Sequence, residues 1–310
     1  MPTVDLHYFP GWTRKSITFT IDDGNVALDT KFLNIVKPAG ILGTFNLTTP
    51  LTQGTPDEYR ALYDGYEIAN HNRRHANPFR VSEPPQMKDE LFDPAAADER
   101  YTYRTEEEGV YRTKYHYGWV YVLTDDKYME YVDSCTRDLE DVFGKGKIRS
   151  YVWPNGQHDH PVVTGRITHH GFQSVRKTGC TTDTTGFAMP ADRMAWSYNA
   201  NNTNLTEVAA LYEAYPDDGA LKFFCFGVHS HDFERAGNWY VLEDFARRYG
   251  NRPEDYYYAS VGTLMDYEDA VAAVTVTDTA VINPTDVDLY IKVDGERITL
   301  RRHSTYTFRA

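Results

Sequence analysis

The sequence predicts an α/β fold, a distorted (β/α) barrel of about seven strands that carries a small C-terminal β appendage. Segments typical of strands and of helices alternate over most of the 310 residues, and this alternation implies parallel strands joined by right-handed crossovers. The number of repeats, about seven to eight, suits a barrel. A doubly wound sheet is the alternative, but no Gly-x-Gly-x-x-Gly run opens a helix, so dinucleotide binding has little support.

Hydrophobic periodicity and turn residues define the expected elements. In the first strand Ile17, Phe19 and Ile21 alternate with threonines, and an Asp-Asp-Gly turn ends the run. The second helix begins with a capping box formed by Thr55 and Glu58. The other expected strands lie at 41–47, 66–71, 148–156, 172–179 and 221–231, the helices at 26–40, 55–65, 127–144, 161–171, 205–216 and 239–250, and a last strand–helix pair at 255–271.

A charged, tyrosine-rich segment from about 80 to 126 interrupts this rhythm. Loops of this length are commonly lids or binding elements, although alternating aromatic residues also suit one face of a structural hairpin or a dimer contact. We therefore expect a barrel domain at 1–271 with an insertion at about 80–126. A small β-rich extension is expected at 272–310, which alternates and contains Asn-Pro and Asp-Gly turns. The aromatic residues of the insertion are Tyr101, Tyr103, Tyr111, Tyr115, Tyr117, Trp119 and Tyr121.

Composition excludes several partners. The net charge of −13 argues against nucleic acid and against an anionic membrane surface, because both attract basic proteins. No apolar stretch approaches the length of a membrane span. The N-terminus lacks the pattern of a secretory leader, so a cytoplasmic protein is expected unless a leader has been removed. The three cysteines form no Cys-x-x-Cys pair and are odd in number, which favours reduced structural thiols.

Unusual polar residues follow several of the expected strands. Asp22 and Asp23 end the first, His71 and His75 follow the third, and His229 ends the strand at 221–231. Because the carboxyl ends of barrel strands share one rim, we expect these side chains to converge there. Two imidazoles and one carboxylate make a three-ligand site with an open position, typical of catalytic Zn²⁺. One aspartate could then bind the metal and the other act as a base; the alternative is a solvated Asp-Asp-Gly turn.

At these residues the chain resembles the polysaccharide deacetylases with a NodB-homology domain. Their Thr-Phe-Asp-Asp-Gly motif corresponds to 19–24 (FTIDDG), and their His-(Ser/Thr)-x-x-His motif to 67–75 (EIANHNRRH). Their Arg-x-Pro-x-Gly motif corresponds to 152–156 (VWPNG), and their apolar strand ending in histidine to 223–229 (FFCFGVH). The resemblance covers roughly residues 15 to 270 and implies the barrel of that family.

The resemblance also implies roles for individual residues. Asp22 would be the base, Asp23, His71 and His75 the metal ligands, and His229 the acid. The strand end formed by Trp153, Pro154 and Asn155 would face the substrate, with a backbone N–H near Asn155 stabilising the oxyanion. His231 is the second candidate for the acid, because alternation along the strand places it on the same side as His229.

Two positions depart from the family pattern. The arginine of the third motif is Val152 here, and the second aspartate of the fourth motif, Asp-x-x-Asp-Trp, is Ala195. In the family this arginine and this aspartate orient and tune the acid and base. Arg176, on the next strand, is a candidate substitute for the arginine. Asp192 and Trp196, the remaining members of the fourth motif, are expected near the site.

The resulting hypothesis is a metal-dependent hydrolase that removes acetyl groups, N-acetyl in preference to O-acetyl, from a saccharide or polysaccharide. It would use a water activated by one divalent ion, with Zn²⁺ favoured and Co²⁺, Ni²⁺ or Mn²⁺ as alternatives. The acidic insertion favours a neutral or cationic glycan. Two other hypotheses stay open: a carbohydrate-binding relative with impaired turnover, and an amide hydrolase of another kind on the same scaffold. The sequence predicts neither the sugar nor the oligomeric state.

Overall fold

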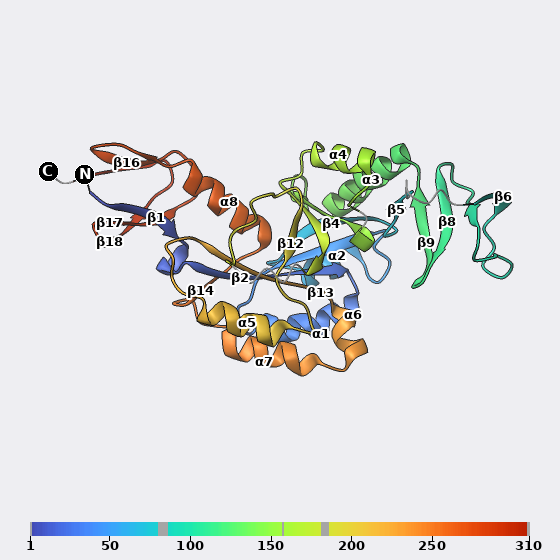
Figure 1. Cartoon of the computed structure of the whole chain (residues 1–310), viewed down its shortest axis with the longest axis horizontal. Coiled ribbons are helices and arrows are strands. Elements are labelled where there is room, and N and C mark those ends of the chain that lie inside the picture. Colours follow the sequence, from blue (N-terminus) through green and yellow to red (C-terminus); the bar gives the residue numbers. More distant parts are fainter. Residues whose placement is uncertain (1, 80–85, 157, 181–185, 309–310) are drawn as a thin grey trace.

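The computed structural model describes residues 2–79, 86–156, 158–180 and 186–308 and is centred on a parallel barrel (Figure 1). The strands follow the order β12-β11-β10-β4-β3-β2-β13. A parallel bridge between Ala200 and Phe226 connects the two ends of this order, and Gly227 N–H donates to the Ala200 carbonyl at 2.9 Å. The predicted seven-stranded barrel is therefore confirmed. Its strands are β2 (Lys15–Asp23), β3 (Thr44–Thr49), β4 (Glu67–Arg73), β10 (Ser150–Val152), β11 (Ser174–Cys180), β12 (Trp196–Tyr198) and β13 (Lys222–His229).

Helices cover the outside of the barrel, and most of them lie where periodicity predicts them. The capping box of α2 is present, with Thr55 accepting from Glu58 N–H and Glu58 accepting from Thr55 N–H. No helix in the described ranges is long and apolar enough to cross a membrane. The sequence did not predict α6 or β12, which are short. The helices are α1 (Val26–Val36), α2 (Pro56–Leu62), α3 (Asp125–Phe143), α4 (Pro161–Thr168), α5 (Leu205–Ala214), α6 (Ser230–Ala236), α7 (Trp239–Tyr249) and α8 (Val261–Ala272), with 3₁₀ turns η1 (Pro10–Trp12) and η2 (Pro154–Gly156).

The pleat of β2 separates the core from the barrel interior. Phe19 contacts Phe32 of α1 at a ring-centroid distance of 5.0 Å and Phe45 of β3 at 5.4 Å. Alternate residues of a strand point to opposite faces, so Thr20 and Asp22 point into the barrel. Both are buried. The strand that carries the aspartate pair is thus fixed by an aromatic core on one face and by polar contacts on the other.

The tyrosine-rich insertion forms a five-stranded sheet in the order β5-β9-β8-β7-β6. This insertion sheet extends away from the barrel beyond α3 (Figure 1). Its central pair, β8 and β9, is an antiparallel hairpin, the form expected under the structural alternative. Part of the predicted insertion, residues 80–85, lies outside the described residues. The strands are β5 (Asn77–Pro78), β6 (Met87–Leu91), β7 (Thr102–Arg104), β8 (Val110–Tyr115) and β9 (Gly118–Leu123).

The C-terminal extension is β-structured, as predicted, but it also includes the start of the chain. Strand β1 (Val4–Tyr8) pairs antiparallel with β17 (Leu289–Val293), which the boundary predicted at residue 271 did not anticipate. Strand β14 (Tyr256–Tyr258) pairs with the first residues of β2 beside the barrel. The remaining strands are β15 (Thr275–Val276), β16 (Ala280–Asn283), β18 (Glu296–Leu300) and β19 (Ser304–Thr307).

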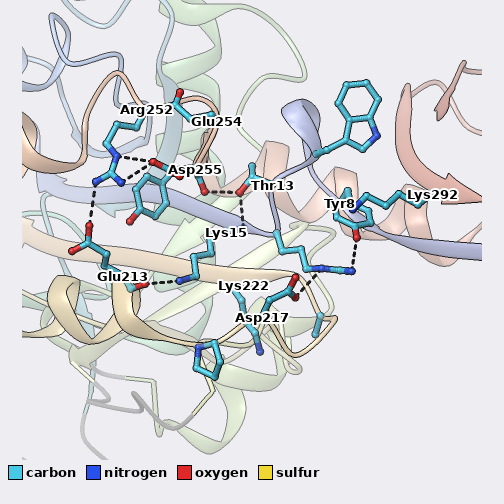
Figure 2. A pocket seen from close by; sticks show the side chains of 15 residues that line it. Tyr8, Thr13, Lys15, Glu213, Asp217, Lys222, Arg252, Glu254, Asp255 and Lys292 are labelled. Atoms are coloured by element: carbon cyan, nitrogen blue, oxygen red, sulfur yellow. Dashed lines mark hydrogen bonds and ion pairs between the residues drawn. The ribbon is translucent and has the colours of Figure 1, made fainter. Parts of the chain in front are cut away.

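A pocket of about 380 Å³ lies where β2 and β13 begin, at the opposite end of these strands from the aspartate pair (Figure 2). Several of its charged groups are held by other groups of the pocket. Lys15 Nζ donates to the Glu213 carbonyl at 2.8 Å, Arg252 lies 3.2 Å from the Glu213 carboxylate, and Arg14 lies 2.9 Å from Asp217. This network joins the start of β2, the end of α5 and the loop after α7. We therefore assign it a structural role.

Tyr267 of α8 connects the barrel helices to the C-terminal sheet. Its hydroxyl donates to the Tyr8 carbonyl and accepts from Tyr290 N–H at 3.1 Å, and its side chain is buried. We expect Tyr267→Phe to lower the free energy of unfolding by about 1–3 kcal/mol, because both backbone groups lose their partner. Thermal unfolding would measure this. Tyr240→Phe, at a site that is 62% exposed, is the control, and an equal effect of the two variants would contradict the assigned role.

Candidate active site and metal centre

Three side chains that the sequence predicts as metal ligands lie together at the rim formed by the carboxyl ends of β2 and β4. Asp23 Oδ1 lies 3.5 Å from His71 Nε2 and 3.6 Å from His75 Nε2. Ligand atoms held about 2.0–2.1 Å from a tetrahedral ion are separated by roughly 3.3–3.5 Å. These two distances match that spacing, and all three ligand atoms lie within 4.8 Å of one another, so the three residues could hold a divalent ion.

His71 is oriented by the neighbouring strand. Its Nδ1 lies 3.0 Å from the Val152 carbonyl, and because a carbonyl only accepts, Nδ1 carries the proton and Nε2 keeps its lone pair. His71 Nε2 and Asp23 Oδ1 are buried atoms without a hydrogen-bond partner within the described part of the chain. Buried polar atoms are normally paired, so two orphaned acceptors that face each other fit a bound cation.

His75 reaches the site by a turn rather than by a helix. The four-residue spacing of His71 and His75 would also fit one helical turn, but Asn72, Arg74 and His75 have positive φ values of 61°, 54° and 49°. The two rings are nevertheless 4.8 Å apart. Burial, together with the neighbouring His71, lowers the pKa of His75 to about 4, so its ring is neutral and able to bind a metal at physiological pH.

The two adjacent aspartates point in different directions. Asp22 follows the pleat into the barrel, whereas Asp23 has a φ of 79°, which turns its carboxylate toward the histidines at the rim. Burial alone would raise the pKa of Asp23, but His71, His75 and His229 hold it well below its ordinary value. The Asp23 carboxylate is therefore ionised and could serve as an anionic metal ligand.

Asp22 is held by two donors inside the barrel. Asn46 Nδ2 donates to Asp22 Oδ1 at 2.7 Å, and Arg176 Nη2 donates to the same oxygen. Burial would raise the pKa of Asp22, but the Arg176 guanidinium and His71 keep it below its ordinary value. The structure thus places Arg176, 1% exposed, against the carboxylate that the third-motif arginine was expected to orient.

Arg176 is in turn positioned by β12 and β13. The Tyr198 ring lies 5.3 Å from the guanidinium carbon. A Cβ at Gly227 would lie 2.1 Å from that ring, so the glycine leaves the space that the tyrosine fills. Strand β12, which the sequence did not predict, therefore helps to position Arg176 at the site.

His229 lies on the other side of Asp23, with Nε2 3.8 Å from Asp23 Oδ2. Its Nδ1 is 2.9 Å from Asp232 Oδ2, which also accepts from His229 N–H at 3.1 Å. Burial would lower the pKa of His229, but Asp232, Asp22 and Asp23 raise it to about 9. Asp232 was not among the residues expected at the site. The sequence does contain a signal for it, because Asp232 is a polar residue three positions after the strand-ending His229, which is the spacing of a helix-capping box.

His231 lies beside His229, with stacked rings 4.6 Å apart. It reaches this place from the first turn of α6 and not by continuing the strand, since β13 ends at His229. The expected strand alternation is therefore wrong, although the expected proximity is observed.

Several expected site residues have other surroundings. Trp153 is 1% exposed and packs against Tyr128 and Tyr151, so its side chain cannot contact a substrate. Trp196 is buried against Phe223. Asp192 is exposed and accepts from Met194 N–H at 2.8 Å in a local turn. The substrate-facing position expected for Trp153 and the place near the site expected for Asp192 are therefore not observed, whereas Trp196 pairs in register with Arg176 and stays a prediction as a supporting residue.

The turn after β10 does reach the metal centre. Pro154 is buried, and Asn155 has a φ of 51°. The Asn155 side-chain amide lies 3.3 Å from His75 Nδ1 and donates to Asn77 Oδ1 at 3.2 Å. Asn155 thus links the turn, the second histidine and the insertion sheet.

Comparison with known proteins gives a family match. A family model described as polysaccharide deacetylase matches residues 11–175, just over half of the chain. A comparison with curated proteins found no significant match.

Solved structures similar to this chain include a peptidoglycan deacetylase from Bacillus subtilis, with 12% identity, a TM-score of 0.46 and coverage of 84% of this chain and 94% of that chain. A chitin deacetylase from the fungal pathogen Colletotrichum lindemuthianum has 13% identity, a TM-score of 0.44 and coverages of 85% and 90%. A family 4 carbohydrate esterase from Streptomyces lividans has 10% identity, a TM-score of 0.44 and coverages of 76% and 88%.

The metal centre makes a direct prediction. We expect about one divalent ion per chain, and we expect His71→Ala and His75→Ala to reduce its affinity at least tenfold because each removes one of three ligands. Asp22→Asn should retain the ion, since Asp22 faces Arg176 instead. Elemental analysis and metal titration measure both effects, and full metal content in the two histidine variants would refute the ligand set.

Proposed function

This chain belongs to the polysaccharide deacetylase family, and on that premise we propose that it removes acetyl groups from a saccharide or polysaccharide, N-acetyl in preference to O-acetyl. The family consists of hydrolases of acetyl amide and ester bonds. The observation that best supports activity in this chain is the pair of orphaned acceptors, His71 Nε2 and Asp23 Oδ1, next to His75. A base and an acid flank them, as a hydrolase of this kind requires.

Asp23, His71 and His75 would hold one divalent ion. One carboxylate and two imidazoles suit Zn²⁺, and Co²⁺, Ni²⁺ or Mn²⁺ also accept this donor set. When bound, such an ion supplies Lewis-acid polarisation of the acyl oxygen and lowers the pKa of a water molecule. The residues fit the ion because their free lone pairs already converge on one point.

Asp22 is the proposed general base. Its lowered pKa keeps it ionised at neutral pH, so it can accept the proton that the attacking water loses. Both of its hydrogen bonds within the described part of the chain reach Oδ1, which leaves Oδ2 to receive the proton. Arg176 and Asn46 hold the carboxylate in place during the transfer.

His229 is the proposed general acid. Its raised pKa means that it is protonated at neutral pH. As the carbon–nitrogen bond breaks, the leaving nitrogen takes the proton from Nε2, since an amine anion leaves poorly. Asp232 keeps the ring oriented through Nδ1 and stabilises its charged form. The products are acetate and the free amine.

The turn at Pro154–Gly156 is the proposed oxyanion site. The positive φ of Asn155 and the 3.3 Å contact between its side-chain amide and His75 Nδ1 support this role. A backbone N–H near Asn155 would donate to the oxygen that becomes negative in the tetrahedral intermediate, which is often the largest catalytic contribution. Trp153 supports this turn from the core.

The alternative of an impaired relative rested on the absent third-motif arginine and fourth-motif aspartate. The structure supplies a guanidinium at Asp22 from Arg176 and a carboxylate at His229 from Asp232. These contacts support turnover. We also propose that 1–271 and 272–310 are the two organisational units; β1, at the start of the first range, pairs with β17 of the second.

Acetate release tests the proposed function. We expect release from acetylated saccharides that depends on added divalent metal and is lost with a chelator. Asp22→Asn should lower kcat at least a hundredfold while the metal content stays unchanged, because an amide cannot accept the proton. Unchanged kcat in this variant would exclude Asp22 as the base.

The contact between Asp232 and His229 predicts how kcat/KM depends on pH. The protonated, proton-donating form of His229 predominates below its pKa of about 9 and is lost above it. Asp232→Asn removes a neighbouring negative charge, lowers this pKa, and should move the alkaline limb of kcat/KM for an N-acetyl substrate to lower pH. An activated ester, whose leaving group needs no proton, should show no such shift. Asp244→Asn, on the exposed side of α7, is the control, and equal shifts on amide and ester would argue against His229 as the acid.

A further inference from the structure

The insertion sheet is attached to the metal centre through its inner strand. Asn77 of β5 accepts from the Asn155 amide at 3.2 Å, and the same amide lies 3.3 Å from His75 Nδ1. Asn77 pairs with Val122 of β9, and Val122 with Tyr111 of β8. Because paired residues share a face of the sheet, this face begins at the metal centre. We call it the site-side face.

The opposite face is occupied by its own side chains. The Arg112 guanidinium carbon lies 4.1 Å from the Tyr121 ring centroid and 5.1 Å from that of Phe92. The Phe92 ring lies 4.8 Å from Trp119, and Tyr103 is buried among them. This cation–aromatic layer holds the sheet together. Three of the seven aromatic residues named for the insertion, Tyr103, Trp119 and Tyr121, belong to this layer.

The site-side face carries two aromatic rings near β5 and exposed apolar side chains at the outer strand. The Phe79 and Tyr111 rings are 5.0 Å apart next to β5. Further out, the hydroxyls of Thr102 and Thr113 are joined by a hydrogen bond of 2.9 Å, and Thr102 is 1% exposed, so this pair belongs to the structure of the sheet and not to its accessible surface. At the outer strand, the register places Met87 beside Thr102 and Leu91 beside Arg104. Met87 is 48% and Leu91 45% exposed, so apolar side chains face solvent on the same surface as the two rings.

We propose that the site-side face binds the saccharide chain beyond the sugar whose acetyl group is removed. The partly exposed rings of Phe79 and Tyr111 and the exposed side chains of Met87 and Leu91 match the C–H faces of an uncharged sugar chain. The guanidinium of Arg104, also on this face by register, donates to the Asp89 carbonyl. The proposal rests on the proposed function, because the face is continuous with the metal centre through Asn77.

The size of the face sets the length of the ligand. Asn77 of β5 and Val122 of β9 are buried, so the accessible part of the face runs from β8 to β6, two spacings of about 4.8 Å or about 10 Å in total. That distance exceeds one sugar unit. The enzyme should therefore prefer oligosaccharides to single sugars, with the preference generated by this face rather than by the barrel.

The experiment uses the full-length metal-loaded protein and three variants. Tyr111→Ala removes a ring of the site-side face, and Tyr111→Phe keeps it. Tyr121→Ala is the matched control, because it removes a ring from the opposite face. The substrates are N-acetylglucosamine from monomer to hexamer, acetylated xylo-oligosaccharides, and 4-nitrophenyl acetate as a small activated ester. Calorimetry with the hexamers and metal-stripped protein measures binding without turnover.

We expect Tyr111→Ala to raise KM for hexamers about five- to tenfold, the equivalent of one lost ring contact, with kcat and ester hydrolysis unchanged. Tyr111→Phe should behave as the wild type, and Tyr121→Ala should leave the preference for chain length intact. The double variant Met87→Ala, Leu91→Ala, at exposed positions that do not threaten folding, should weaken binding of hexamers but not of dimers.

Failure of the proposed binding face and failure of the proposed function would give different results. Hexamer binding that Tyr111→Ala weakens, without acetate release from any substrate, would support the face and overturn the proposed function. If Tyr111→Ala hydrolyses the ester and its kinetics with the hexamer are unchanged, the proposed binding face is wrong but the proposed function stands. Failure of every oligosaccharide to bind the wild type would also overturn it. A variant that changes only the sedimentation coefficient would assign the face to a contact with a second copy of the chain.

Discussion

The ion pair between Asp22 and Arg176 is the constraint on which the rest of the site depends. Both side chains are almost completely buried, at 5% and 1% exposure, and an unpaired charge at such a place would cost several kcal/mol. Arg176 comes from β11 and Asp22 from β2, so the pair crosses the barrel interior. It is possible only because β12 closes the ring and Tyr198 lies against the guanidinium, in the space left by Gly227.

This pair explains how two adjacent carboxylates coexist. Like charges side by side normally favour protonation of one partner. Here Asp22 is neutralised by a guanidinium inside the barrel, whereas Asp23, turned out by its positive φ, is surrounded by His71, His75 and His229. Each carboxylate therefore keeps its charge for a separate reason. One is available to accept a proton and the other to bind a cation.

Local patterns predicted the elements and the groups at the rim, because strand ends in a parallel barrel converge by topology alone. The same reasoning could not predict Asp232, which is defined by the cap of α6, or the pairing of β1 with β17, which joins the two ends of the chain. It failed for Trp153 because a motif position does not reveal which face of the strand is buried. Arg176 was found because a missing charge partner implies a substitute nearby.

The insertion was expected to be either a lid or a structural hairpin, and its contacts favour a fixed platform. Glu107, in the loop before β8, accepts from the Tyr131 hydroxyl of α3 at 2.8 Å and lies 3.2 Å from Lys127 and 3.5 Å from Arg74. Arg74 directly precedes the metal-site residue His75. Movement of the sheet would break these contacts together with the Asn77–Asn155 bond. If the saccharide chain binds the sheet as proposed, these contacts would hold it at a set distance from the candidate metal site, which favours orientation over closure.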